Sequence, residues 1–161
     1  MGLELKPSKT RITHTLHEHN GLVGFDFLGF NIRQYKVGKT HSGKSTHSKL
    51  LGFKTLIKPS KEAIKRHYQK LEHIIEQNIH APQATLIKKL NPVIRGWTSY
   101  YSAVVSTRVF SKLSHLMFVK LWRWAKRRHS AKPAKWIVRK YWHPKQRKWT
   151  FVTTEGYTLY E

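Results

Sequence analysis

The chain has 161 residues, and its 31 Lys and Arg against 8 Asp and Glu give a formal net charge of +23 at pH 7. A charge this large favours a polyanionic partner, with nucleic acid first and an anionic membrane surface as the alternative. The absence of Cys excludes disulfides and thiolate zinc sites, and no apolar run approaches the length of a membrane span or of a secretory signal.

A short strand end is predicted at residues 3–5, which lie outside the residues described below, and three further β-strands are predicted before residue 58. Residues 10–15 alternate polar with β-branched side chains, and residues 23–35 and 53–57 are rich in aromatic and β-branched types. We expect the first two of these three strands to form a hairpin across residues 16–22. So few strands cannot bury a sheet alone, so we interpret residues 1–57 as the end of a larger domain.

A basic loop is predicted over residues 36–49. Within it, residues 38–45 match the phosphate-loop pattern GxxxxGK(S/T), which binds phosphate only where a strand precedes it and a helix follows. The residues that follow contain Gly52 and are predicted to form a loop and then a strand. A basic loop near nucleic acid is therefore favoured over a nucleotide site.

From Ser60, a predicted N-cap, the apolar spacing changes to that of helices. The first helix is predicted to bury Ile64, Tyr68, Leu71, Ile74 and Ile75. The second has an apolar stripe of Leu86, Leu90, Val93, Trp97, Tyr100 and Val104. Its Pro92 predicts either a kink or the junction of two helices. The third, capped by Ser106 or Thr107, is predicted to bury Phe110, Leu113, Met117, Leu121 and Trp124.

The C-terminal residues are predicted to form a short helix over 133–141 and a strand pair over 149–160 around Gly156. The predicted fold class is therefore α+β, with short N-terminal strands followed by a three-helix bundle and a basic tail. We expect three segments along the chain. These are a strand segment (1–57), a helical domain (58–131) and a basic, Trp-rich tail (132–161).

The C-terminal half combines basic and aromatic residues without acids. Between Glu76 and Glu155 there are seventeen Lys or Arg and no Asp or Glu, and five of the six Trp lie in the last third of the chain. Basic side chains neutralise phosphates, and aromatic faces can stack unpaired bases. Each Trp could equally be a core residue. The acid-free span favours nucleic-acid binding, because a merely solvated face mixes both signs.

Catalysis by this chain alone is not predicted. Metal-dependent phosphoryl transfer uses two or more converging carboxylates, whereas Asp26 is the single Asp, and Glu72 and Glu76 are predicted to face solvent. We also expect no metal, cofactor or small-molecule substrate, since few carboxylates and no Cys could complete a site with the neighbouring histidines His14, His17 and His19.

Two N-terminal segments resemble group II intron-encoded proteins, which combine reverse transcriptase and maturase activities. Residues 2–12 (GLELKPSKTRI) resemble the late palm motif of that family, and Lys9 and Thr10 are the matching motif residues. Residues 24–30 (GFDFLGF) resemble the next motif. There the resemblance implies that the turn Phe27-Leu28-Gly29-Phe30 is a primer grip.

The rest of the chain continues the resemblance in the same order. Residues from 58 onward look like the maturase-specific, or thumb, domain, in which residues 95–101 (RGWTSYY) match the signature RGWxxYY. Residues 121–129 (LWRWAKRRH) resemble the helix after it, and residues 148–151 the segment after the thumb. The family's YADD motif with its catalytic Asp pair, the fingers, most of the palm and the HNH-type endonuclease have no counterpart here. The chain thus looks like a C-terminal fragment, comprising the end of the palm and the thumb domain.

The resemblance implies an RNA-binding maturase module that assists splicing of group II intron RNA, with template–primer duplex as a further partner. Two alternatives stay open. One is a portion of an RNA-directed DNA polymerase that is active only with its missing palm and fingers. The other is a non-functional remnant that binds any polyanion. Mg²⁺ would serve only the complete parent enzyme, no membrane partner is expected, and the expected location is the bacterial cytoplasm or an organellar matrix.

Trp97 and Tyr100 are predicted to be core residues because they lie on the apolar stripe of the second helix. Tyr101 and Arg95 fall off that stripe and are predicted to face RNA. The complete set of predicted RNA contacts is Lys61, Lys65, Arg66, Lys88, Lys89, Arg95, Tyr101, Arg108, Lys112, Arg123, Arg127 and Arg128.

Overall fold

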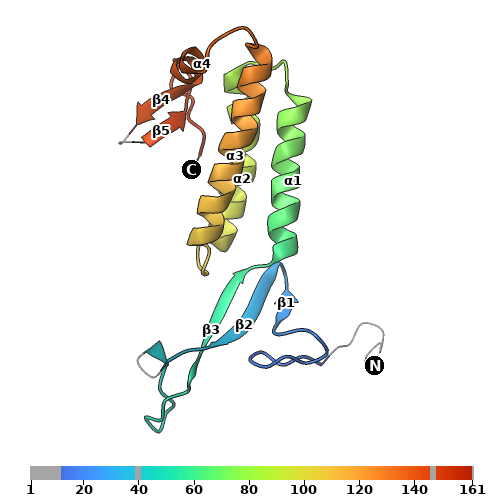
Figure 1. The fold of residues 1–161 in the computed structure, drawn as a ribbon, viewed down its shortest axis with the longest axis vertical. Coiled ribbons are helices and arrows are strands. Elements are labelled where there is room, and N and C mark those ends of the chain that lie inside the picture. The colour runs from blue at the N-terminus through green and yellow to red at the C-terminus, as the bar shows by residue number, and fades with distance from the viewer. Residues whose placement is uncertain (1–11, 39–40, 146–147, 161) are drawn as a thin grey trace, which may run out of the picture. The chain divides into compact units, whose positions relative to one another are not determined.

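The computed structural model describes residues 12–38, 41–145 and 148–160. The chain divides into two compact units, unit 1 (Met1–Lys61) and unit 2 (Glu62–Glu161), which are described separately below. Strands β1 to β3 come first, then helices α1 to α4, and then strands β4 and β5 (Figure 1). The predicted α+β fold class is confirmed.

Unit 1 contains a three-stranded antiparallel sheet in the order β1-β2-β3, formed by Phe25–Phe27, Phe30–Lys36 and Phe53–Pro59. Leu28 and Gly29 have positive φ angles of 47° and 83°, and they form the two-residue turn between β1 and β2. The prediction of one strand over 23–35 is therefore wrong, because this turn divides it. The third predicted strand is confirmed and extends to Pro59.

The segment before β1 lies beside the sheet without being a strand. Isolated hydrogen bonds hold this segment to the sheet. The Thr13 hydroxyl donates to the Gly24 carbonyl (3.0 Å), and the backbone amide of Gln34 donates to the Thr15 carbonyl (2.8 Å). The predicted strand over 10–15 is thus wrong over its described part, and so is the hairpin across 16–22. Gly24 is required here, since its φ is +78° and a Cβ would lie 2.4 Å from the Ile32 carbonyl oxygen.

The loop between β2 and β3 contains no α-helix among its described residues, and His41 alone has 3₁₀ geometry. The Ser45 amide donates to the Lys49 carbonyl (2.8 Å), and Lys44 and Leu50 form a β-bridge that turns the chain back toward β3. Lys39 and Thr40 of the phosphate-loop pattern lie outside the described residues. Because no helix N-terminus follows Lys44, the geometry that the pattern needs for nucleotide binding is missing.

Unit 2 is built on α1 (Lys61–Gln77), α2 (Gln83–Tyr101) and α3 (Thr107–Arg128), which lie side by side (Figure 1). Helix α2 continues through Pro92, so two separate helices meeting there are excluded. Four of the five residues of the predicted apolar stripe of α3 are buried (Leu113, Met117, Leu121 and Trp124), whereas Phe110 is only partly buried. The buried face of α1 differs from the prediction by one position, since Ile64 and Tyr68 are only partly buried and the buried side chains are Ala63, His67, Leu71 and Ile75.

The C-terminal elements pack onto the same core as the helices. The predicted short helix is confirmed as α4 (Ala134–Tyr141), and it leads into an antiparallel pair of β4 (Trp142–Lys145) and β5 (Lys148–Phe151). The predicted strand pair around Gly156 is borne out in part. Its first strand is β5, which pairs with β4. After β5 the chain turns back around Gly156, held by the Val152–Thr158 bridge and by backbone hydrogen bonds from Thr153 to Tyr157 and from Leu159 to Phe151, both 2.9 Å, but no second strand forms. The core includes Leu86, Leu90, Leu121, Trp124, Ile137, Tyr141, Trp142 and Phe151.

The turn between α1 and α2 is fixed by side chains of α3. The Trp124 indole donates to the Asn78 carbonyl (2.9 Å), and the Arg128 guanidinium donates to the carbonyls of Ile79 (2.7 Å) and Ala81 (2.9 Å). Arg128 also lies over the Trp124 ring, 4.8 Å from its centroid. These contacts satisfy carbonyls that follow the end of α1, so Arg128 stabilises the fold.

Candidate nucleic-acid interface

One face of α3 presents a row of cations to solvent. We name this row the α3 stripe, and its five members, all exposed, are Arg108, Lys112, Arg123, Lys126 and Arg127. At about 100° per residue they share one side of the helix, and the buried Leu113, Met117 and Leu121 lie on the other. The apolar face thus fixes the helix against the core and aims the cations outward.

The α3 stripe is not neutralised by neighbouring acids. Within the described residues one ion pair is present, between Lys120 and Glu72, and neither belongs to the stripe. Glu72 was predicted to face solvent but instead holds Lys120 against α1. Helix α3 contains no acidic residue at all, so the stripe's positive charge remains available to an external polyanion.

Most predicted RNA contacts lie on the surface, but several also contact other side chains. Lys88 lies over the Tyr157 ring (4.4 Å to its centroid), Arg95 lies over the Tyr160 ring (5.3 Å), and Lys89 donates to the Asn78 side chain (2.8 Å). The exposed members of the predicted set are Lys61, Lys65, Arg66, Lys88, Lys89, Arg95, Arg108, Lys112, Arg123 and Arg127. Arg128 is partly buried in the fold contacts described above.

The structure reverses the predicted positions of Tyr100 and Tyr101, because Tyr101 is buried and Tyr100 is on the surface. Tyr101 is 4% exposed and packs on Trp97 with ring centroids 4.6 Å apart, whereas Tyr100 is 52% exposed. A stripe spaced every 3.5 residues drifts by about 20° per heptad on a straight helix, so two heptads after Leu86 the next residue faces the core. The prediction that Tyr101 faces RNA is therefore wrong, and Tyr100 is the aromatic side chain on the surface.

A groove of about 580 Å³ runs between α1 and α2, and we name it the α1–α2 groove. Arg66 and Lys70 line it from α1, and Gly96 and Tyr100 line it from α2. No acidic residue lines it. The complete lining is Ala63, Arg66, His67, Lys70, Pro92, Val93, Gly96, Trp97, Tyr100 and Tyr101. The groove therefore combines positive charge with exposed aromatic surface.

His67 lies on the inner side of the groove as a neutral ring. It is 7% exposed and stacks on Trp97, with ring centroids 4.5 Å apart and planes 11° apart. Burial, with the nearby positive charge of Lys70, lowers the pKa of His67 from 6.5 to about 4. Of the groove residues, sequence reasoning missed His67, Lys70 and Gly96. Lys70 could have been found, because it follows Arg66 by one helical turn.

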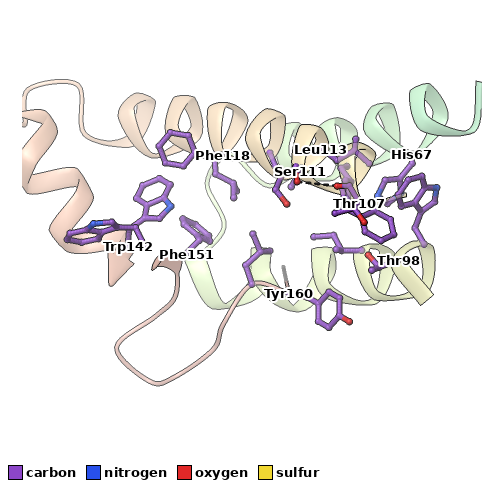
Figure 2. Close-up of a pocket in the computed structure, with 18 residues that line it drawn as sticks. His67, Thr98, Thr107, Ser111, Leu113, Phe118, Trp142, Phe151 and Tyr160 are labelled. Atoms are coloured by element: carbon purple, nitrogen blue, oxygen red, sulfur yellow. Dashed lines mark hydrogen bonds between the residues drawn. The ribbon is translucent and has the colours of Figure 1, made fainter. Parts of the chain in front are cut away.

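A second hollow, of about 540 Å³, lies between α2, α3 and the β4–β5 hairpin (Figure 2). Its lining is mostly apolar, with Phe118, Trp142 and Phe151 at one end and His67 at the other, and it includes no Lys, Arg, Asp or Glu. Lacking charge, this cavity does not suit phosphate. Of the six Trp, Trp124 and Trp142 are core residues, and Trp149 is 61% exposed.

In unit 1, the predicted primer-grip residues form the turn between β1 and β2. Phe27 is 60% exposed and Leu28 is 71% exposed, whereas Phe30 is partly buried. The Gly29 carbonyl accepts a hydrogen bond from the Ser60 amide (2.8 Å), which holds the turn against the end of β3. The other predicted palm residues, Lys9 and Thr10, lie outside the described residues.

The neighbouring N-terminal histidines do not converge on a common point. The Nδ1 atom of His14 accepts hydrogen bonds from the amides of Leu16 and His17, both at 3.0 Å, and so closes a local turn. Over the part of the chain that the structure describes, no three His, Asp or Glu side chains are grouped as metal ligands would be. No helix within the described ranges is long and apolar enough to cross a membrane.

Part of unit 2 matches a known protein family. Residues 64–142 match the family described as the group II intron, maturase-specific domain. The match covers most of α1, all of α2, α3 and α4, and the first residue of β4. It therefore contains the α3 stripe and every residue that lines the α1–α2 groove except Ala63. A search of curated proteins found no match. Residues 64–142 therefore form a group II intron maturase-specific domain.

Proposed function

We propose that unit 2 binds group II intron RNA and assists its splicing, with the α3 stripe as the main phosphate-binding surface. The observation that supports this most directly is the row of five exposed cations on a helix without acids. Phosphate contacts supply most of the affinity of such surfaces, and each contact adds to the salt dependence of binding. The match to the group II intron, maturase-specific domain supports group II intron RNA as the partner.

The proposed binding requires a preformed surface. Leu113, Met117, Leu121, Trp124 and Ala125 are all buried, so α3 is held along most of its length by the core. A helix fixed in this way loses little conformational freedom when it binds, and its cations keep their spacing. The stripe can therefore follow a phosphate backbone without refolding.

The test compares two variants of equal net charge. In the stripe variant, four residues are replaced by Gln (Arg108, Lys112, Arg123 and Arg127). In the matched control, four exposed lysines of unit 1 are replaced by Gln (Lys36, Lys44, Lys49 and Lys54). Fluorescence anisotropy then measures binding to labelled group II intron RNA and to a random duplex.

The stripe variant is expected to lose roughly ten-fold or more in affinity for intron RNA at 150 mM salt, and the control much less. Equal losses in both variants would contradict the placement on α3. Equal wild-type affinity for intron RNA and random duplex would instead support the remnant alternative. Splicing of the intron at low Mg²⁺, with and without the chain, tests the maturase activity itself.

A second role, in gripping template–primer duplex, has its own support in unit 1. Phe27 and Leu28 expose apolar side chains on a tight turn whose backbone is fixed by two positive φ angles and by the Ser60 bond. Primer extension tests it by adding a separately produced fingers and palm. Extension that depends on this chain and is lost in Phe27→Ser would support the role, and extension that is the same without the chain would contradict it.

A further inference from the structure

The α1–α2 groove holds space that the fold itself does not use. Gly96 has no positive φ angle, and a Cβ built on it meets no atom within 4 Å. Gly in a helix interior costs about 1 kcal/mol relative to Ala. Neither backbone conformation nor internal packing therefore requires glycine at this position of α2. The open space lies on the side of the helix that lines the groove.

The groove around Gly96 combines positive charge with aromatic surface. Arg66 and Lys70 supply positive charge from α1, no acid lines the groove, and the volume of about 580 Å³ lies within the range of about 300–1,000 Å³ of small-ligand sites. Tyr100, 52% exposed, packs edge-on against Tyr101 with ring centroids 4.8 Å apart. Its ring is thus held in place by a neighbour and still reaches the surface.

The aromatic residues continue inward from the surface in an ordered series. Tyr101 contacts Trp97, and Trp97 stacks on His67, which is neutral because burial lowers its pKa to about 4. Positive charge therefore lies at the rim of the groove, on Arg66 and Lys70, and the interior is uncharged and aromatic. This separation matches a nucleotide, whose phosphate is anionic and whose base is a flat, neutral ring.

We propose that the α1–α2 groove binds an unpaired nucleotide of RNA, with its phosphate at Arg66 and Lys70 and its base on Tyr100 beside Gly96. This rests on the RNA binding proposed for unit 2 and names the form of RNA that the groove takes. Bases within a duplex are stacked and paired, so they cannot enter such a groove. The α3 stripe, by contrast, is proposed to bind phosphates, which single-stranded and duplex RNA both present.

The test fills the groove without changing its charge. Gly96→Leu extends a side chain into the open space, and Gly96→Ala raises helix propensity in the same way but adds one carbon. Both variants should melt at or above the wild-type Tm. Anisotropy with a labelled 12-nucleotide single-stranded RNA and a 20-base-pair RNA duplex, of mixed sequence, measures binding by each full-length variant.

Gly96→Leu is expected to weaken single-strand binding by roughly ten-fold and duplex binding by less than two-fold, with Gly96→Ala close to wild type. An unchanged single-strand affinity, or an equal loss for both RNAs, would overturn the proposal. If the wild-type chain binds neither RNA, the proposed function itself fails.

A second pair of variants, at Tyr100, tests whether the base stacks on the Tyr100 ring. Tyr100→Ala should lose about five-fold or more on the single strand alone, and Tyr100→Phe should retain binding. Equal affinities of Ala and Phe would also overturn it.

Discussion

His67 makes the stability of unit 2 depend on pH in a way that can be calculated. Its folded-state pKa is about 4 because the ring is buried against Trp97 and near Lys70, whereas an unfolded His titrates near 6.5. The unfolded chain therefore binds a proton at higher pH than the folded chain does. Stability from the neutral ring is complete above pH 6.5 and is lost as the pH falls toward 4.

The size of this loss of stability follows from the pKa values of His67 in the folded and unfolded chain. Between pH 7.5 and 4.5, this one group is expected to remove about 2.5 kcal/mol from the free energy of unfolding. His67→Phe provides the comparison, since Phe can keep an aromatic contact with Trp97 and cannot be protonated. The variant should lose about 2.5 kcal/mol less than wild type over the same pH range.

Urea unfolding of both proteins, followed by Trp fluorescence at several pH values, measures the difference directly. The two proteins differ only at residue 67, so the contributions of all other groups cancel in the comparison. If the two curves of unfolding free energy against pH run parallel from pH 7.5 to 4.5, the ring of His67 is not held neutral by burial. The account of the groove interior would then be refuted.

Three further predictions concern the residues that hold each unit together. Arg128→Gln should lower the free energy of unfolding by about 2 kcal/mol in chemical denaturation, because two charged hydrogen bonds are lost, whereas Arg127→Gln on the exposed stripe should stay within about 0.5 kcal/mol. Gly24→Ala should disrupt unit 1, since the new Cβ would lie 2.4 Å from the Ile32 carbonyl oxygen, and faster amide exchange in β2 would reveal it. Trp124→Phe should cost at least 1 kcal/mol by the same unfolding assay, through the lost indole hydrogen bond and some packing, and an unchanged Tm would contradict this.

Helix α3 could be predicted from sequence because one periodic pattern decides its orientation. Its apolar residues recur at helical spacing and face a single core, so the exposed positions of Arg108, Lys112 and Arg123 followed directly. The match of residues 95–101 to the signature RGWxxYY could also be made from sequence, although it assigned no role to Gly96. In such segments the local pattern and the tertiary packing agree, and reading the sequence recovers the buried face.

Other features could not be predicted from the sequence pattern, because helix geometry, backbone conformation or tertiary packing decides them. The reversal of Tyr100 and Tyr101 comes from the drift between a 3.5-residue pattern and a 3.6-residue helix. The hairpin in residues 23–35 depends on Leu28 accepting a positive φ, which composition does not favour. Arg128 and His67 belong to residue types that are usually exposed, and only the packed structure shows that one caps a turn and the other stacks in the core.

The salt dependence of RNA binding tests the central claim most directly. For the full chain and a labelled single-stranded RNA, six or more phosphate contacts predict a slope of about −4 or steeper in a plot of log affinity against log salt concentration. Replacing the four stripe residues Arg108, Lys112, Arg123 and Arg127 by Gln should make that slope shallower by about 2 to 3. A slope near zero for wild type, or an unchanged slope for the stripe variant, would contradict phosphate binding by α3.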